Sequence, residues 1–206
     1  MNIRAEQLGY WYLRLNGFLT TANFIVHPDV GRNQETDVDI LGVRFPYRSE
    51  NLIQPMEDDA LSFPIGKTLV VFAEIKTGMC NLNGPWTKPE RDNMRRVLMA
   101  VGPLHQDEAA TASDSLYAQG VFENQLYRIT LLCLGQTVNP EIENKYPQIL
   151  QVTWDRVFSF IFRRFHDYSN QKSSHGQWEA NGLALWDAAM SSSAEEEFQN
   201  SIKLVG

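Results

Sequence analysis

Two carboxylates and a lysine lie at the ends of two apolar segments, an arrangement that can hold a divalent cation beside a fixed positive charge. Asp39 precedes an apolar pair, and Glu74 ends an apolar run and is followed two residues later by Lys76. Side chains two residues apart on a strand point to the same face, so Glu74 and Lys76 would lie together. Carboxylate oxygens are the ligands that Mg²⁺ prefers, and the backbone carbonyl of Ile75 is a natural further ligand.

These residue types match what the hydrolysis of a phosphodiester requires. The reaction needs a water made nucleophilic and a charged transition state that is stabilised, and a magnesium ion contributes to both. Lys76 can orient the water, help to deprotonate it, or offset charge on the phosphate. The sequence therefore predicts metal-dependent nuclease chemistry at Asp39, Glu74 and Lys76. The alternative interpretation of Glu74 and Lys76 is an ordinary surface ion pair, which contributes little to stability.

The strands that carry these residues are predicted from hydrophobic periodicity. Thr68 to Ile75 is the strongest strand prediction, because it is apolar on both faces until Glu74, as in a central strand. The strand predicted over 36–45 alternates between two faces. One face carries Asp37, Asp39, Leu41 and Val43, and the other carries Val38, Ile40 and Gly42.

The remaining elements complete an α/β layered domain with a mixed sheet. The proline-containing segment 46–66 would be a long surface loop, and 105–120 would be a loop or a weak helix. We expect one domain over 1–206, with a core of about 4–135 and a C-terminal helical part of about 150–206. The other predicted elements are a helix over 4–22 that ends or bends at Asn16-Gly17, strands over 18–26, 126–134 and 149–152, and helices over 89–101, 153–168 and 178–190.

Two segments resemble the PD-(D/E)xK, or restriction-endonuclease-like, nuclease superfamily. They are Thr36-Asp37-Val38-Asp39-Ile40-Leu41 and Phe72-Ala73-Glu74-Ile75-Lys76-Thr77-Gly78. Leu15-Asn16-Gly17-Phe18, which follows a helix that bears Glu6, is similar to the opening of Holliday-junction resolvases and related nucleases. The resemblance covers roughly residues 4–135. It implies a restriction-endonuclease-like core, a central mixed sheet flanked by helices in the order α-β-β-β-α-β, to which this chain adds C-terminal helices.

The resemblance also implies an activity and a metal site. It implies cleavage of DNA, or less often RNA, with Mg²⁺ as the cofactor and Mn²⁺ as a possible substitute. Asp39, Glu74, the carbonyl of Ile75 and Glu6 would bind the metal. Lys76 would position the attacking water, so that all four side chains would be catalytic residues.

The match to the family has departures and alternatives. No proline precedes Asp39, and the separation of Asp39 from Glu74 is long, so that 46–66 would be an insertion. Asp37 is an alternative ligand, but Asp39 is favoured because it directly precedes the apolar pair. Glu6 is alternatively an ordinary exposed helix residue.

Three residues near the site are candidates for contact with nucleic acid. Arg91 and Arg95 share a helix face at i, i+4 and would contact phosphate, or would lie on a solvated face with an Asp92–Arg96 pair. Trp86 would stack on a base, or would pack at the sheet edge.

Composition narrows the range of functions. The net charge of −7 argues against a protein that coats nucleic acid by charge alone, although a nuclease needs only a local basic rim. No apolar run approaches the roughly 20 residues of a membrane helix, so no membrane partner is expected. The first residues lack the apolar core of a signal peptide. Cys80 and Cys133 fit neither a zinc motif nor a disulfide framework, so a cytoplasmic location is expected.

Two functional hypotheses follow. The first is a Mg²⁺-dependent nuclease that acts on DNA, as a homo-oligomer or as a subunit of a complex, of the kind found among effectors of prokaryotic antiviral defence. The assignment to defence rests on analogy with the family. The second is a nuclease-fold nucleic-acid-binding or scaffolding subunit whose activity is absent or depends on a partner.

Overall fold

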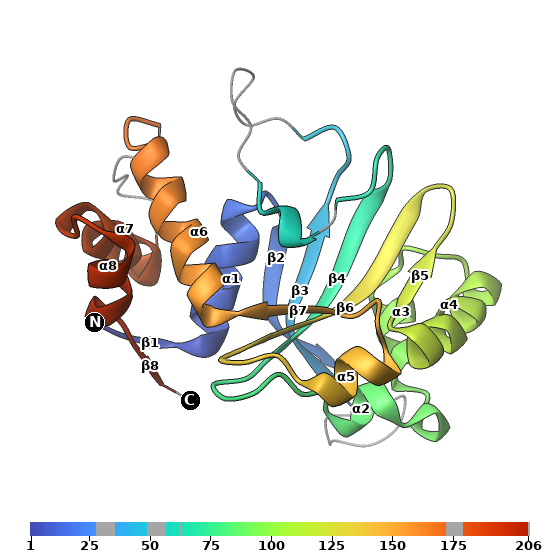
Figure 1. Ribbon diagram of the computed structural model, residues 1–206. Coiled ribbons are helices and arrows are strands. Elements are labelled where there is room, and N and C mark those ends of the chain that lie inside the picture. Colours follow the sequence, from blue (N-terminus) through green and yellow to red (C-terminus); the bar gives the residue numbers. More distant parts are fainter. Residues whose placement is uncertain (28–35, 49–56, 62, 172–178, 206) are drawn as a thin grey trace.

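A six-stranded mixed β-sheet with helices on both faces organises the chain in the computed structural model (Figure 1). The predicted α/β class with a mixed central sheet is therefore confirmed. The structure describes residues 1–27, 36–48, 57–61, 63–171 and 179–205.

The sheet joins an antiparallel meander to a parallel crossover. β2 (Leu19–Val26), β3 (Thr36–Arg44) and β4 (Thr68–Ile75) are antiparallel neighbours. β4 then pairs in parallel with β6 (Tyr127–Gly135), a connection that needs a crossover between the two strands. β6 also pairs antiparallel with β5 (Val121–Glu123) and parallel with β7 (Leu150–Thr153).

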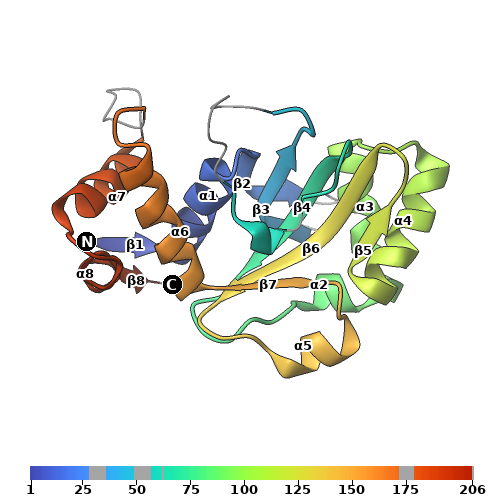
Figure 2. The same cartoon turned by 45° about the horizontal axis from the view of Figure 1, so that its top comes forward.

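Helices cover the two faces of this sheet as two layers (Figures 1 and 2). α1 (Ala5–Leu15) and α6 (Trp154–Asp167) share one buried apolar cluster with the strands. α3 (Asn93–Val101) and α4 (Gln106–Gln119) share a second cluster on the opposite face. The remaining elements are β1 (Asn2–Arg4), η1 (Asp59–Leu61), α2 (Gly84–Thr87), η2 (Pro89–Arg91), α5 (Pro140–Lys145), α7 (Ala180–Ser191), α8 (Glu195–Ser201) and β8 (Lys203–Val205), which pairs with β1.

The first helix ends at the predicted point. Leu8, Tyr12 and Leu15 recur at helical spacing and are buried against the sheet. Asn16 then donates from Nδ2 to the carbonyl of Tyr12, and Gly17 adopts φ 86°, a left-handed conformation that favours glycine. The chain therefore turns directly from α1 into β2, which begins at Leu19.

The helix predicted over 89–101 is interrupted, which corrects that prediction. Pro89–Arg91 forms a 3₁₀ turn, Asp92 adopts a left-handed φ of 57°, and α3 begins only at Asn93. Arg91 and Arg95 therefore do not share one helix face.

Several helices and strands of the structure have only a weak signal, or none, in the sequence. The segment 105–120 forms the 14-residue helix α4, whose buried face consists largely of the small residues Ala109 and Ala112 with Leu116. Small residues give little hydrophobic periodicity, which explains why the helix was predicted only as a weak alternative. β1, β5, α5, α8 and β8 are short, and none of them was predicted.

The segment predicted as an insertion, 46–66, is anchored at its described end. Asp58 is buried and accepts hydrogen bonds from Tyr12 Oη at 2.8 Å and from Arg156 Nε at 2.9 Å. Its backbone N–H donates to Asn16 Oδ1 at 2.8 Å. These bonds fix the chain between α1 and α6 before it enters β4. Residues 49–56 and 62 of the predicted loop lie outside the described residues.

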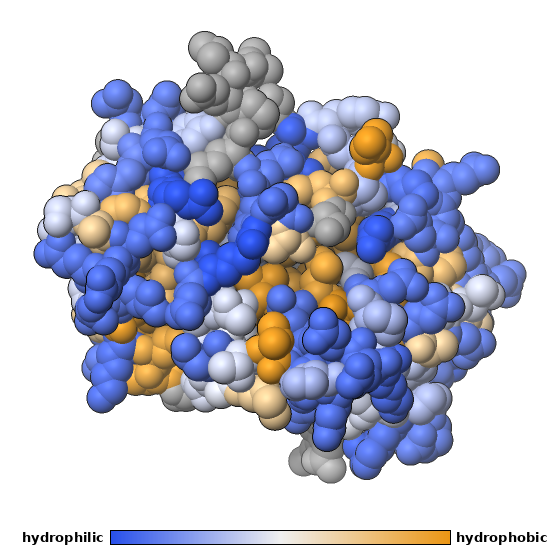
Figure 3. Space-filling view, in the orientation of Figure 1, coloured by the Kyte–Doolittle hydropathy of each residue, from blue (hydrophilic) through white to orange (hydrophobic). Residues whose placement is uncertain are grey.

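One face of the molecule carries a central group of exposed apolar side chains over β6 and β7, within a mostly hydrophilic surface (Figure 3). Within the residues that the structure describes, no helix has both the length and the apolar character needed to cross a membrane.

Candidate active site

The β3–β4 ladder ends at the predicted acidic residues. Its last pairs join Leu41 to Phe72 and Ile40 to Ala73, so the next position along the ladder sets Asp39 opposite Glu74. At that point Asp39 uses its side chain, and Oδ2 accepts a hydrogen bond from the backbone N–H of Ile75 at 2.7 Å. The carboxylate thus takes the place of a backbone partner where the two strands separate.

A break in the pleat of β3 accounts for the direction of Asp39. Val38 packs in the cluster on the α3 side together with Leu41, whereas Ile40 packs on the α1 side. Strict alternation would have placed Val38 with Ile40, so the predicted division of faces is wrong at this end of the strand. Asn23, opposite Asp39 on β2, adopts a positive φ of 51°. Such irregularities re-aim side chains and are frequent beside functional sites.

Glu74 is buried, and both of its carboxylate oxygens accept hydrogen bonds. Only 3% of the residue is exposed, and Oε1 accepts from Lys76 Nζ at 2.5 Å while Oε2 accepts from Trp86 Nε1 at 2.6 Å. Lys76 Nζ also donates to Asn83 Oδ1 at 3.0 Å. Glu74 and Lys76 do form the ion pair of the alternative interpretation, but the pair is not an ordinary surface one, because the carboxylate of Glu74 is buried.

Glu6 approaches the same region from α1. Gly9, three residues later and on the same helix face, lets the helix lie close to the sheet, since a Cβ there would lie 3.0 Å from Ile75 Cδ1 and 3.1 Å from Ile40 Cδ1. Glu6 Oε2 is buried, and within the described part of the chain it has no hydrogen-bond partner. An unsatisfied buried carboxylate oxygen is costly and calls for a ligand. Glu6 is therefore not an ordinary exposed helix residue.

The pKa shifts show that the carboxylates of the site act on one another electrostatically. Burial raises the pKa of Asp39, and the negative charges of Asp37 and Glu6 raise it further, against the opposing effects of the Ile75 N–H and of Lys76. Burial likewise raises the pKa of Glu74, with a contribution from Asp39, while Lys76 and Trp86 oppose the rise. Asp39 is thus the carboxylate that adjoins both Glu74 and Glu6, and its neighbourhood favours an added positive charge.

Three carboxylates and one backbone carbonyl are the oxygen donors that this region could offer to a divalent metal. Among the described residues, no group of three or more His, Cys, Asp or Glu side chains is arranged to hold an ion. Glu74 lies on the face of β4 covered by α3, whereas Glu6 comes from the helix on the other face, which explains why the three carboxylates do not form one cluster. The chemistry of the set nevertheless fits a hard cation, because all the donors are oxygens and Glu6 Oε2 has no hydrogen-bond partner among the described residues.

The backbone carbonyl of Ile75 lies on the same strand edge as Asp39. In a strand, the N–H and C=O of one residue point to the same side. The N–H of Ile75 points to Asp39, while the next N–H, that of Lys76, donates to Leu134 on β6 at 2.8 Å. The Ile75 carbonyl is therefore directed toward the gap between β3 and β4.

Trp86 lies inside the molecule rather than on its surface. It is 3% exposed, and its ring stacks on that of Phe72 with centroids 6.3 Å apart and an interplanar angle of 22°. This position fits the alternative interpretation of packing against the sheet, and the indole offers no free face to a base. Its hydrogen bond to Glu74 was not anticipated, because nothing in the local sequence pattern links residues 74 and 86.

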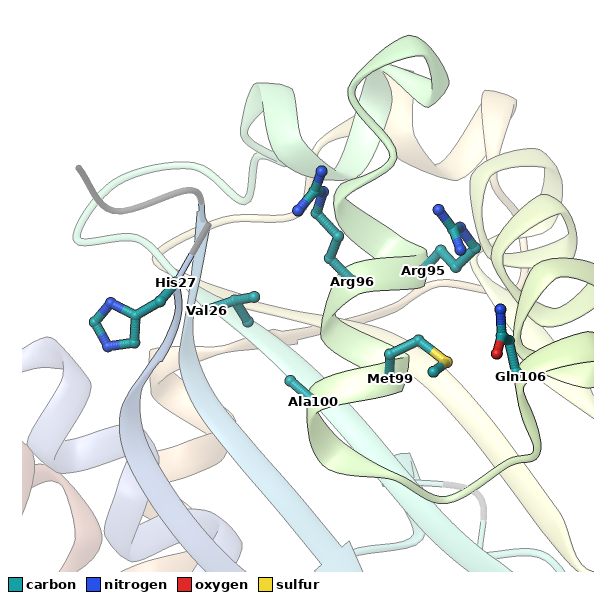
Figure 4. Close-up of a pocket in the computed structure, with 7 residues that line it drawn as sticks. All are labelled: Val26, His27, Arg95, Arg96, Met99, Ala100 and Gln106. Carbon is teal, nitrogen blue, oxygen red and sulfur yellow. The ribbon is translucent and has the colours of Figure 1, made fainter. Parts of the chain in front are cut away.

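Arg95 lines a cavity of about 540 Å³ between α3 and the end of β2 (Figure 4). Asp92 holds the guanidinium through Arg95 Nε at 2.9 Å. Arg91 is exposed on the preceding 3₁₀ turn and is not part of this cavity. The residues that line the cavity are Val26, His27, Arg95, Arg96, Met99, Ala100 and Gln106.

The cavity lies at the same end of the sheet as the carboxylates. Val26 is three residues along β2 from Asn23, the residue opposite Asp39, which corresponds to a rise of about 10 Å.

Comparisons of the chain with protein-family models, with curated proteins and with solved structures found no match.

Proposed function

We propose that the chain is a Mg²⁺-dependent nuclease with a restriction-endonuclease-like core that hydrolyses phosphodiester bonds in DNA. The observation that carries the proposal is the meeting of Asp39 with the Glu74-Ile75-Lys76 segment, where the carboxylate of Asp39 on β3 accepts from the backbone of Ile75 at the end of β4. The buried carboxylate of Glu74, the ammonium group of Lys76 and the carbonyl of Ile75 then lie together at the end of β4. Glu6, with its unsatisfied oxygen, adds a further anionic donor.

The connectivity also supports the proposal. If the short elements η1, α2, η2 and β5 and the helix α4 are taken as additions, the chain order α1, β2, β3, β4, α3, β6 agrees with the order that the resemblance implies. The three meander strands are antiparallel, and the strand after the crossover pairs in parallel with β4, which carries Glu74.

In the proposed reaction, Asp39, Glu74, Glu6 and the carbonyl of Ile75 would hold the ion. When bound, the ion supplies Lewis-acid activation of water and of the scissile phosphate. Lys76, steadied by Glu74 Oε1 and Asn83 Oδ1, is a fixed cation that orients the attacking water and offsets charge on the phosphate oxygens. Because Glu74 is buried, these interactions act in surroundings of low dielectric constant, where they are stronger than in water.

The proposal is tested by incubating the purified chain with plasmid and with single- and double-stranded oligonucleotides in Mg²⁺, Mn²⁺ or EDTA. Lys76→Ala and Asp39→Ala are compared with the wild type after each variant is shown to be folded. We expect metal-dependent cleavage by the wild type and at least a 100-fold loss in each variant, since removal of one such group typically costs about that factor. Cleavage by both variants at the wild-type rate would show that the site is assigned wrongly.

A second candidate function is supported by the state of Glu74. Both of its oxygens accept hydrogen bonds, from Lys76 and from Trp86, and the described carboxylates do not form a three-membered metal group. A nucleic-acid-binding or scaffolding subunit whose activity depends on a partner would have such a site. The same assay separates the two: a chain that binds oligonucleotides but is inert with every metal and substrate is a binding subunit.

A further inference from the structure

We propose that Trp86 is a positioning residue that orients the carboxylate of Glu74 for the metal. This inference rests on the proposed function, and it goes beyond the residue types that the sequence motif identifies. The indole N–H donates to Glu74 Oε2 at 2.6 Å, and both groups are buried. A buried donor at this distance restricts the torsion angles of the carboxylate to those that keep the bond.

Stacking on Phe72 fixes the position of the Trp86 indole relative to the sheet. Phe72 is two residues before Glu74 on β4, so the two side chains leave the sheet on the same face. The rings of Phe72 and Trp86 are stacked at an interplanar angle of 22°, and this contact places the edge of the indole beside the Glu74 carboxylate. The rotamer of Trp86 is thus fixed by packing and not by the hydrogen bond alone.

The turn that carries Trp86 also holds Lys76. Asn83 begins this turn, and its carbonyl accepts from the backbone N–H of Trp86 at 3.0 Å. Asn83 Oδ1 accepts from Lys76 Nζ at 3.0 Å. Residues 83–86 therefore contact both charged side chains of the Glu74-x-Lys76 motif, one through an amide and the other through an indole.

The turn is itself tied to the helical layer above it. Tyr117 Oη on α4 donates to the carbonyl of Pro85 at 3.2 Å and accepts from the backbone N–H of Met94 on α3 at 3.1 Å. The position of Trp86 is therefore set by α3 and α4, so that these helices influence the site through it.

An indole N–H is a suitable partner for a metal-binding carboxylate. It is neutral, so it fixes one oxygen without adding a positive charge that would repel a cation. Removal of a hydrogen bond that orients a metal ligand typically weakens metal affinity by about 10- to 100-fold. We expect this loss for Trp86→Phe, which keeps an aromatic ring against Phe72 and removes only the donor and part of the ring.

Trp11→Phe is the matched control. Trp11 is also buried, and its Nε1 donates to a carboxylate, Glu179 Oε1, at 2.9 Å, but this bond joins α1 to the start of α7. The substitution removes the same chemical group and a similar volume. It should lower thermal stability as Trp86→Phe does, while Mn²⁺ affinity changes by less than about twofold.

The experiment measures the dissociation constant for Mn²⁺ by calorimetry on the wild type and on both variants, at a temperature where circular dichroism shows each to be folded. A 10- to 100-fold weaker constant in Trp86→Phe alone supports the proposal. Equal constants in the wild type and Trp86→Phe overturn it while leaving the proposed function intact. A wild type that neither binds Mn²⁺ nor cleaves nucleic acid overturns the proposed function itself.

A second measurement applies if Trp86→Phe does not fold. In ¹H–¹⁵N spectra of the wild type, addition of Mg²⁺ should shift the indole resonance of Trp86, because its acceptor becomes a metal ligand. The indole resonance of Trp11, assigned through Trp11→Phe, should not move. A Trp86 resonance as insensitive as that of Trp11, in a protein that binds Mg²⁺ by calorimetry, would refute the proposal.

Discussion

Replacing Asp39 with asparagine should stabilise the metal-free protein while abolishing its response to metal. The carboxylate is partly buried near Asp37 and Glu6, and burial followed by these charges holds its pKa above the ordinary value of 3.8. Asparagine keeps an oxygen that can accept from the Ile75 N–H and removes the charge that the site disfavours. Sites built for a charged ligand commonly cost stability when the ligand is absent.

The direction of this stability change follows from the linkage between proton binding at Asp39 and folding. Because the folded state holds the proton of Asp39 more tightly than the unfolded state, stability falls as pH rises from 3.8 through the raised pKa. Solvent screening at this partly exposed group reduces the free energy that is lost at neutral pH. In a chain of this size, 1 kcal/mol corresponds to about 2–4 °C in Tm. Asp39→Asn should therefore raise Tm at pH 7 and should have little effect near pH 3.

The assay is thermal unfolding of the wild type, Asp39→Asn and Asp37→Asn at several pH values, in EDTA and in Mn²⁺. Manganese at about 100 times its dissociation constant adds roughly 2.7 kcal/mol to the wild type and should add nothing to Asp39→Asn. Asp37→Asn, which removes a charge from the same strand, should keep the response to metal. If Asp37→Asn loses that response and Asp39→Asn keeps it, Asp37 is the ligand. A metal-free Asp39→Asn that melts below the wild type at pH 7 would refute the electrostatic reasoning.

Three further predictions concern residues around the site. Gly9→Val should destabilise the protein by about 1–3 kcal/mol and reduce cleavage, because the valine side chain would meet Ile75 Cδ1. Chemical denaturation measures the first effect and a cleavage assay the second. Asp58→Ala should lower the free energy of unfolding by about 2–3 kcal/mol, since it leaves the buried Tyr12 hydroxyl without its acceptor. Adding Tyr12→Phe to Asp58→Ala should then lower that free energy little further, which chemical denaturation of the double variant measures. Arg95→Gln should raise KM for DNA with kcat unchanged and reduce the salt dependence of binding by about one charge, and a changed kcat at constant KM would contradict a role in binding.

The central strand β4 and the position of Glu74 near its end were predictable because their signals are local. Thr68–Ile75 is apolar on both faces, and the structure has it as a central strand with those bounds. Glu74 was the exception in an apolar strand, and the structure accounts for the exception by giving its carboxylate two donors. Charge at the end of a buried strand is costly unless it is paired, so it was informative in the sequence alone.

Features that depend on contacts between distant segments were not predictable. The break in alternation at Asp39 depends on the pairing of β3 with β2 and β4, whereas a strand considered alone is expected to alternate. The interruption before α3 depends on the left-handed conformation of Asp92, which the helical period of the segment conceals. The contact of Trp86 with Glu74 results from the tertiary packing of a short turn, and it cannot be predicted from the spacing of the two residues in the sequence.

The central claim is that a divalent cation binds where Asp39 meets the Glu74-Ile75-Lys76 segment. Crystals of the wild-type protein soaked in Mn²⁺, with anomalous diffraction recorded at the manganese edge, test it most directly. We predict an anomalous peak about 2.0–2.3 Å from an oxygen of Asp39 and from the carbonyl of Ile75, with Glu74 or Glu6 completing the protein ligands. A map with no peak at this site, from crystals in which Mn²⁺ reaches the solvent around it, would contradict the account.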